Sequence, residues 1–480
     1  MRLTASQFQP PFQGNRLFAR RAFVGGSLLA LSAASLARGE SSTIDPREFG
    51  LEIPAGPVSA GEGRRVTTTD AEGNSVVAKL HVDVGEHRLV MLPDGQLVTR
   101  TNAEAPLTER PFVAIEKEEL TKRLQTGKLE NFKTKESRRY LYLYNTSENF
   151  ALVTSRILES MFPGIASYYE NLRLGAKTVD VPLVVLMFRT EQEFQDYRRM
   201  PPGVVAYYNV LTNHVVMYEE SKLFRIKPEL GIQQSLSTIA HEGVHQILHN
   251  IGVQQRLSVW PLWLSEGLAE YFAPTTLGKR LQWKGAGQVN DLRMYELENY
   301  LKARSSSTPS GQMIQHTVGA ARLTSTGYAS AWALTTYLAK LERAKFNRYV
   351  AEVSQLGPLE GDRNTVGRGL IAENIANFKK SFGDDTAALE KKLVAYLKRL
   401  PYDDPFAEWP HYAAFVTYTL DGKPKREANI FHVAEMADKW QRETLANLPA
   451  GARDGADAAL REYPNRPFAE RAATEFLRGR

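Results

Sequence analysis

The stretch "STIAHEGVHQILHN", residues 237–250, sets two histidines four positions apart, with a glutamate directly after the first. Around it, apolar residues recur at helical spacing and form one stripe: Leu236, Ile239, Ala240, Val244, Ile247, Leu248 and Ile251. On such a helix His241 and His245 lie about 40° apart around the axis, at the border of the stripe. Two imidazoles placed in this way can share a metal ion, and Glu242 beside them can take a proton from water without binding the ion. The pattern also fits ordinary polar residues at the edge of a buried helix.

A third metal ligand has to come from another element. His249 continues the four-residue spacing, but it lies about 12 Å along the helix axis from His241, so we expect it at the surface or in a supporting position. The segment "PLWLSEGLAEYF", residues 261–272, begins with a proline that suits a helix start and carries two glutamates on one face. We expect Glu266 to be the carboxylate ligand and Glu270, one turn on, to accept the free N–H of a ligand histidine. Read alone, the segment also fits an amphipathic helix with exposed glutamates.

Taken together, "HEGVH" and "LWLSEGLAEYF" resemble the gluzincin metallopeptidases, the thermolysin-like clan. The second motif is similar to the "W-L-N-E-G-F-A" motif of zinc aminopeptidases. The likeness extends to exported proteins of uncharacterised function with a peptidase-MA-like domain. It implies one zinc ion per chain, a general base at Glu242, a supporting residue at Glu270, and three zinc ligands: His241, His245 and Glu266.

This resemblance covers roughly residues 138–400. It matches Tyr328, in "GYASAWALTTYL", to the aminopeptidase tyrosine whose phenol supports the oxyanion; Tyr328 also fits a half-buried tyrosine at a helix start. The motif "G-x-M-E-N", which grips a substrate amino terminus, is absent, and this puts exopeptidase action in doubt. In its place stands "NHVVMYEES", residues 213–221, whose alternation predicts an exposed edge strand able to pair with an extended peptide. His214 in that strand could contact substrate or face solvent.

The motifs therefore predict an exported zinc metallopeptidase that acts on a peptide or protein substrate through metal-activated water and a glutamate base. The alternative is a peptidase-like metal-binding scaffold or recognition protein of the cell envelope, without catalytic activity. Hydrolysis of a non-peptide bond would use the same residues.

The composition is that of a folded protein, with 43% hydrophobic and 24% charged residues. The formal net charge of +6 falls to +2 without the first 37 residues, which hold four arginines and no acid. No dense basic run with interleaved aromatics occurs elsewhere, so we expect no nucleic-acid partner. Because the chain has no cysteine, disulfides, thiolate ligands and a cysteine nucleophile are excluded, and any metal must bind His, Asp or Glu.

The start of the chain is typical of an export signal. Residues 1–37 combine a polar beginning, a modest apolar run from Ala22 to Leu36 and small residues before a cut site. The pair Arg20-Arg21 followed by Phe23 is similar to a twin-arginine signal; ordinary secretion and a retained anchor are the alternatives. The apolar run is short for a membrane span, so we expect no stable span after signal removal and a location in the periplasm, cell envelope or medium.

The remaining chain predicts an α+β protein. "YLYLYN" and "VPLVVLMF" read as strands around a long helix capped by Ser147. Asp94-Gly95 reads as a hairpin turn. The expected parts are a loose lead-in at 38–63, a small β-rich module at 64–118, a gluzincin-like domain at 138–402 with a mixed sheet followed by a mostly helical subdomain, and a helical C-terminal extension of unassigned role at 405–480.

Overall fold

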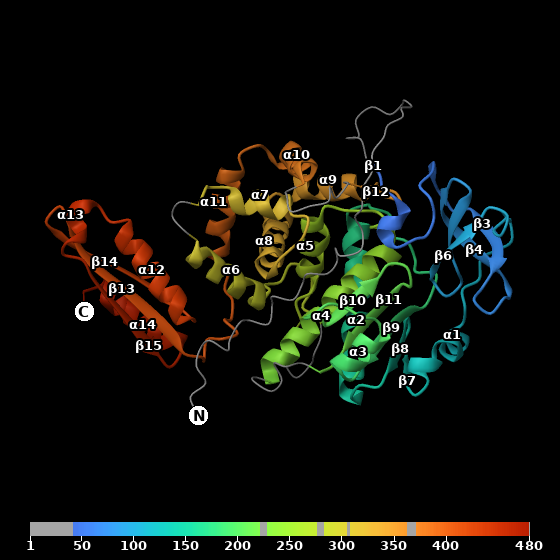
Figure 1. Cartoon of the computed structure of the whole chain (residues 1–480), viewed down its shortest axis with the longest axis horizontal. Coiled ribbons are helices and arrows are strands. Elements are labelled where there is room, and N and C mark those ends of the chain that lie inside the picture. The colour runs from blue at the N-terminus through green and yellow to red at the C-terminus, as the bar shows by residue number, and fades with distance from the viewer. Residues whose placement is uncertain (1–41, 221–227, 276–282, 305–307, 362–370, 480) are drawn as a thin grey trace. The chain divides into compact units, whose positions relative to one another are not determined.

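The computed structural model describes residues 42–479, except 221–227, 276–282, 305–307 and 362–370 (Figure 1). The predicted export signal lies outside the described residues. The fold is α+β, as expected from the sequence. Contacts divide the described residues into two compact units, of which the larger lies within 42–288 and 314–386, and the smaller within 289–313 and 387–479. This division groups 289–313 with the C-terminal segment, whereas the sequence suggested a boundary only near residue 402.

An antiparallel five-stranded sheet opens the larger unit, in the order β2-β4-β5-β6 with β3 paired to β4. Its strands are β2 (Val58–Ala60), β3 (Arg65–Thr69), β4 (Ser75–Val84), β5 (His87–Met91) and β6 (Leu97–Thr101). The predicted hairpin turn at Asp94-Gly95 is confirmed, since Gly95 joins β5 to β6 with φ at 86°. One face of this sheet shares a core with Leu257 and Leu359. The β-rich segment is thus packed into the larger unit.

Part of the expected loose lead-in has regular structure. β2 pairs with β4, and β1 (Ser42–Thr43) pairs with β12 (Glu360–Gly361). A short 3₁₀ helix, η2, spans Pro46–Phe49, and Ile44 is almost fully buried. The Ser, Gly and Pro content of this segment favours a loop, and the strands with which it pairs are distant in the sequence, so its own residues do not indicate the pairing.

A second sheet of the larger unit has the order β10-β11-β9-β8-β7. Its inner strands are parallel and its two edge strands antiparallel. The strands are β7 (Lys133–Glu136), β8 (Tyr140–Tyr144), β9 (Leu183–Phe188), β10 (Ala206–Asn209) and β11 (His214–Tyr218). Every residue of β8, β9 and β11 is buried, which is what continuous apolar runs in parallel strands predict.

The prediction that "NHVVMYEES" forms an exposed edge strand is wrong. β11 pairs with β10 on one side and with β9 on the other. The polar residues at its ends suggested a solvated strand, but burial is decided by the neighbours on each side, which alternation within one strand cannot reveal. The free edge of the sheet belongs to β10.

Helices cover both faces of this second sheet (Figure 1). α2 (Glu148–Asn171) and α4 (Pro228–Asn250) lie on one face; α1 (Lys117–Leu124), the 3₁₀ helix η3 (Gly127–Leu129) and α3 (Glu191–Tyr197) contribute to the other. The predicted cap of α2 is confirmed, because Ser147 Oγ accepts a hydrogen bond from Phe150 N at 3.2 Å. A Cβ at Gly243 would lie 2.3 Å from Leu158 Cδ2, so this glycine lets α4 approach α2 closely.

The chain after α4 is mostly helical, as predicted. The helices are α5 (Leu262–Phe272), α7 (Gln312–Val318), α8 (Ser325–Leu341), α9 (Arg343–Val353) and α10 (Ala372–Phe382). α5 is buried along almost its whole length, since it packs against both α4 and α8. A Cβ at Gly267 would lie 2.7 Å from the Ala331 carbonyl oxygen and 2.2 Å from Thr335 Oγ1. Glycine at this position therefore sets the close spacing of α5 and α8.

The smaller unit corrects the prediction of a helical C-terminal extension, because it is itself α+β. It contains a three-stranded antiparallel sheet in the order β14-β13-β15, with α12 on one face and α14 on the other. The elements are α6 (Asp291–Ala303), α11 (Thr386–Leu397), β13 (His411–Leu420), β14 (Lys423–Phe431), α12 (Ala434–Ala446), α13 (Ala450–Arg453), β15 (Asp457–Tyr463) and α14 (Arg466–Leu477). The letters "DAALREY" favour a helix, but pairing with β13 makes this segment a strand.

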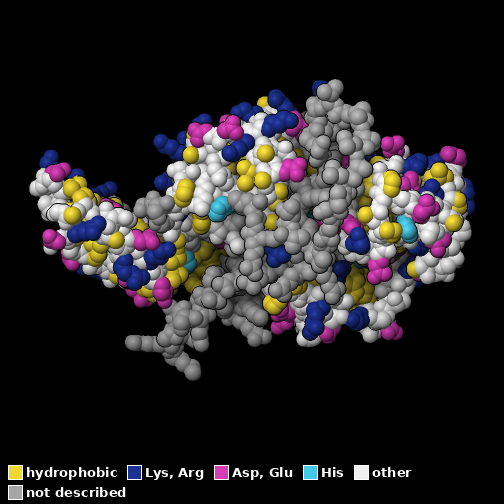
Figure 2. Space-filling model, turned by 45° about the horizontal axis from the view of Figure 1, so that its top comes forward, with side chains coloured by type: hydrophobic (Ala, Val, Ile, Leu, Met, Phe, Trp, Pro, Cys, Tyr) yellow, Lys and Arg dark blue, Asp and Glu magenta, His cyan; other side chains and the backbone are white. Residues whose placement is uncertain are grey.

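On the face shown in Figure 2, lysine and arginine side chains are interspersed with aspartate and glutamate over the described residues. Within the described ranges, no helix is both long enough and apolar enough to cross a membrane.

Candidate metal centre

The two histidines of the motif project from the middle of α4. Their neighbours Ala240 and Val244 are fully buried against the rest of the larger unit, which fixes the rotation of the helix. The rings of His241 and His245 lie with their centroids 4.9 Å apart, and their Nε2 atoms are 3.2 Å apart. One turn of helix thus brings both nitrogen atoms to one point, as the spacing predicted.

Helix α5 brings Glu266 to the same point. Its Oε2 lies 3.0 Å from His241 Nε2 and 3.6 Å from His245 Nε2. Atoms that bind a tetrahedral zinc ion at about 2.0–2.2 Å lie about 3.3–3.6 Å from one another. The three atoms lie 3.0 to 3.6 Å from one another, at or slightly below this spacing, so these side chains could hold a metal ion between them. In the described part of the chain, this is the one group of three or more His, Asp or Glu side chains with such spacing.

Glu270 lies on the other side of the His241 ring. Its Oε1 is 3.1 Å from His241 Nδ1, and its side chain is 2% exposed. A proton on Nδ1 donated to this carboxylate leaves the Nε2 lone pair directed at Glu266 and His245. The structure thus places Glu270 where the sequence expected it, one turn beyond Glu266 and behind a candidate ligand.

The histidines and glutamates of the cluster shift one another's pKa values. Burial opposes the charged form of His241, but the hydrogen bonds that its ring donates to the Glu266 and Glu270 carboxylates outweigh it and raise the His241 pKa well above its ordinary value. Burial likewise opposes ionisation of Glu266, but the positive field of His245 and the bond to His241 lower its pKa below the ordinary value. An ionised carboxylate among imidazoles is a donor set that suits a divalent cation.

Glu242 points from α4 toward the free edge of the second sheet. Its Oε2 accepts a hydrogen bond from the Tyr208 backbone N–H of β10 at 2.8 Å. The side chain is buried, and burial raises the pKa of its carboxyl above the ordinary value. A buried carboxyl with a raised pKa, next in sequence to His241, has the character of a general base.

Tyr328 lies near the cluster on the first turn of α8, which Thr324 caps through Gly327 N. Its ring centroid is 6.1 Å from that of His241. The close α5–α8 packing at Gly267 brings this helix start beside the histidines.

The other two histidines considered from the sequence lie outside the cluster. His249 stacks on the Tyr208 ring with centroids 5.3 Å apart, and its Nδ1 bonds the Gln254 carbonyl at 3.1 Å. His214 is neither exposed nor free to meet solvent: it is 4% exposed, and burial lowers its pKa to about 4.

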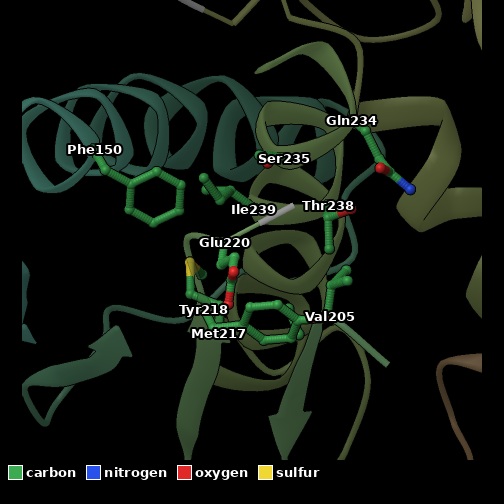
Figure 3. A pocket seen from close by; sticks show the side chains of 10 residues that line it. Phe150, Val205, Met217, Tyr218, Glu220, Gln234, Ser235, Thr238 and Ile239 are labelled. Atoms are coloured by element: carbon green, nitrogen blue, oxygen red, sulfur yellow. The ribbon is translucent and has the colours of Figure 1, made fainter. Parts of the chain in front are cut away.

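Sequence reasoning missed two features beside the cluster. One is the Tyr208 N–H, a backbone group for which a sequence carries no signal. The other is a small hollow (Figure 3). Thr238 and Ile239 of α4 line it, together with Phe150, Val205 and Met217. Thr238 stands one helical turn before Glu242, so the hollow adjoins the same edge of the sheet.

Comparison with known proteins gives one family match. Residues 235–360 match a family described as Protein of unknown function (DUF1570). The matched segment contains all six candidate site residues, from His241 to Tyr328. A search of curated proteins found no match. Over residues 235–360 the chain is therefore similar to a family whose function is not described.

Proposed function

We propose that this chain is a zinc-dependent peptidase of gluzincin type, exported from the cell. One observation carries the proposal: His241, His245 and Glu266 bring their ligand atoms within 3.0 to 3.6 Å of one another, and the buried Glu242 directly follows His241 on α4. This combination suits a hydrolytic site, since a purely structural site needs the ligands but not the extra carboxylate.

The proposed roles follow from the donors present. His241, His245 and Glu266 would hold the ion, with Glu270 orienting His241. Zinc bound there supplies Lewis acidity, which acidifies water and polarises a carbonyl group. Glu242 would take the proton of the attacking water and return it to the leaving amine.

Tyr328 would complete this site from α8. It lies on the first turn of that helix, and its ring centroid is 6.1 Å from that of His241. A phenol O–H directed at a developing oxyanion contributes a few kcal/mol to a hydrolytic transition state. In this proposal Tyr328 is the oxyanion donor and takes no part in holding the ion.

The first experiment is to measure the metal content of the chain comprising residues 38–480 by plasma mass spectrometry after mild dialysis. We expect one zinc per chain in the wild type and its loss in Glu266→Ala. Peptide-library cleavage by the wild type should then disappear in Glu242→Gln, which keeps the ligands, and persist in Glu170→Gln, a matched change at an exposed position of α2. Cleavage by Glu242→Gln as fast as by the wild type would contradict the mechanism.

A different result would favour the scaffold alternative. Zinc bound at one per chain, without cleavage of any library peptide and without an exchangeable water on the metal, would indicate a recognition or structural site. Absence of bound metal in the wild type, even after zinc is resupplied, would remove the metal from the proposal altogether.

A further inference from the structure

A buried arginine outside the metal cluster connects the N-terminal sheet to the site. Arg256 follows α4 and is 5% exposed. Its guanidinium donates to three carbonyl oxygens, those of Val210 at 2.7 Å, Gly95 at 2.7 Å and Leu211 at 2.8 Å. Among the described residues no carboxylate forms an ion pair with it. Burying a cation without a paired carboxylate is costly, and these three directed hydrogen bonds offset that cost.

The three acceptors belong to two hairpin turns. Val210 and Leu211 lie in the turn between β10 and β11, and Gly95 lies in the turn between β5 and β6. The Leu97 N–H also donates to the Leu211 carbonyl at 2.7 Å. On its own side Arg256 is held through its carbonyl, which bonds His81 Nε2 of β4 at 2.8 Å. Arg256 thus joins the N-terminal sheet to the turn that follows β10.

The turn after β10 is two residues from the contact that holds Glu242. Tyr208 donates its N–H to Glu242 Oε2 at 2.8 Å, and its hydroxyl donates to Asn213 Oδ1, also at 2.8 Å. Asn213 closes the turn, since its N–H donates to the Asn209 carbonyl. A shift of the turn would therefore move the Tyr208 amide, and with it the carboxylate that this amide holds.

We infer that Arg256 is a positioning residue of the candidate active site: it clamps the β10–β11 turn to the N-terminal sheet, and so fixes the Tyr208 N–H that holds Glu242. In this way the N-terminal sheet helps to position Glu242, although it contributes none of the candidate site residues. For its effect on turnover this inference rests on the proposed peptidase function. Its effect on β10 does not.

The first arm of the test reads β10 directly. Zinc-loaded chains of residues 38–480 carrying Arg256→Gln or Arg256→Lys are compared by amide hydrogen exchange, with Arg156→Gln as a matched change at an exposed site of α2. We expect faster exchange over residues 206–213 in Arg256→Gln, partial protection in Arg256→Lys, and no change in Arg156→Gln, with zinc content preserved in all three. Unchanged exchange over 206–213 in both Arg256 variants would overturn the inference. If Arg256→Gln does not fold, Arg256→Lys decides.

The second arm reads turnover and tests whether Arg256 acts through Glu242. We expect Arg256→Gln to lower kcat about 10- to 100-fold with KM little changed, which is the size of effect that a misplaced catalytic group produces. In a Glu242→Asp background, which keeps a carboxylate at this position but displaces it, the same change should cost little further. Additive losses would contradict a route through Glu242. A wild type that cleaves no peptide would count against the proposed function, and the exchange over β10 would then judge the clamp alone.

Discussion

Glu270 shows at the scale of a residue how much of the site depends on a side chain that is not itself a candidate ligand. It is 2% exposed and bonds His241 Nδ1 at 3.1 Å. We predict that Glu270→Gln lowers zinc affinity by about 10- to 100-fold, because the neutral amide orients and polarises the imidazole less strongly. Competition with a chromophoric chelator measures the change, with Glu170→Gln as the control. Equal affinities would mean that Glu270 only packs against the ring.

Single residues also show which parts of the site the sequence could predict. His241, His245 and Glu266 come together because a four-residue spacing fixes two side chains on one helix and the second motif provides the third. His214 was harder to place, because burial depends on neighbours that its own strand does not reveal. The Tyr208 amide could not be predicted at all, since every residue except proline carries the same backbone donor.

Between elements, the contact of α5 with α8 has little room. A Cβ at Gly267 would meet Thr335 Oγ1 at 2.2 Å and the Ala331 carbonyl oxygen at 2.7 Å. We predict that Gly267→Ala destabilises the protein by about 1–3 kcal/mol, as overpacking of a close contact does, and reduces turnover because α8 carries Tyr328. Denaturant unfolding measures the first effect.

A second variant separates the two clashes at Gly267. Adding Thr335→Ala removes the side-chain clash but leaves the Ala331 carbonyl in place, so stability should return only in part. Full recovery would indicate that the backbone clash relaxes without cost, and no loss in Gly267→Ala would show that the helices are not held at this spacing.

The elements of the C-terminal segment mark a limit of pattern reasoning. Asp421-Gly422 joins β13 to β14 with both residues at positive φ, 51° and 71°. This dipeptide is the same as Asp94-Gly95, and in the sequence it is the signal that indicates a β-hairpin in this segment. β15 had no such sign, because its residues have helical propensity and pairing with β13 decides their conformation. The pairing of β15 with β13, forty or more residues earlier in the chain, thus outweighs the local helical propensity.

On the scale of the whole chain, the N-terminal sheet and the rest of the larger unit share one core. Val82, Val84 and Leu89 pack in the same cluster as Leu257 and Leu359. We predict that a chain beginning at residue 111 does not fold, because the apolar side chains of Leu257 and Leu359 would be exposed to water. Circular dichroism and size-exclusion chromatography of the truncated chain test this. A soluble, cooperatively unfolding product would contradict it and would make the N-terminal sheet a separable module.

The smaller unit should lose stability in acid. Burial opposes ionisation of Glu298 and Asp404. Lys302 and Arg466 stabilise the ionised form of Glu298, and His411 and Arg466 stabilise that of Asp404. These contacts outweigh burial and lower both pKa values to about 2. Since these folded-state pKa values lie below the ordinary ones, the stabilisation is present above about pH 4.5 and is lost as pH falls toward 2. We expect a loss of a few kcal/mol across that range, measured as lower protection factors of the β13 amides, with each exchange rate referred to the intrinsic rate at the same pH.

The control for this acid effect is Arg466→Gln. It removes the cation that bonds both Glu298 at 2.9 Å and Asp404 at 2.7 Å. The variant should be less stable at pH 7 and should depend less on pH between 5 and 2. An equally steep pH dependence in the variant would assign the acid sensitivity to other carboxylates.

The contact between Glu242 and Tyr208 has a consequence for solubility. An edge strand with unpaired amides is a template on which strands of other molecules can assemble into aggregates. β10 is only four residues long, and its Tyr208 amide is already bonded to a buried carboxylate. The short edge and the bonded amide leave little for a foreign strand to join. The glutamate that we assign to proton transfer therefore also protects the protein against self-association, and a variant lacking this carboxylate is at risk of aggregation as well as of inactivity.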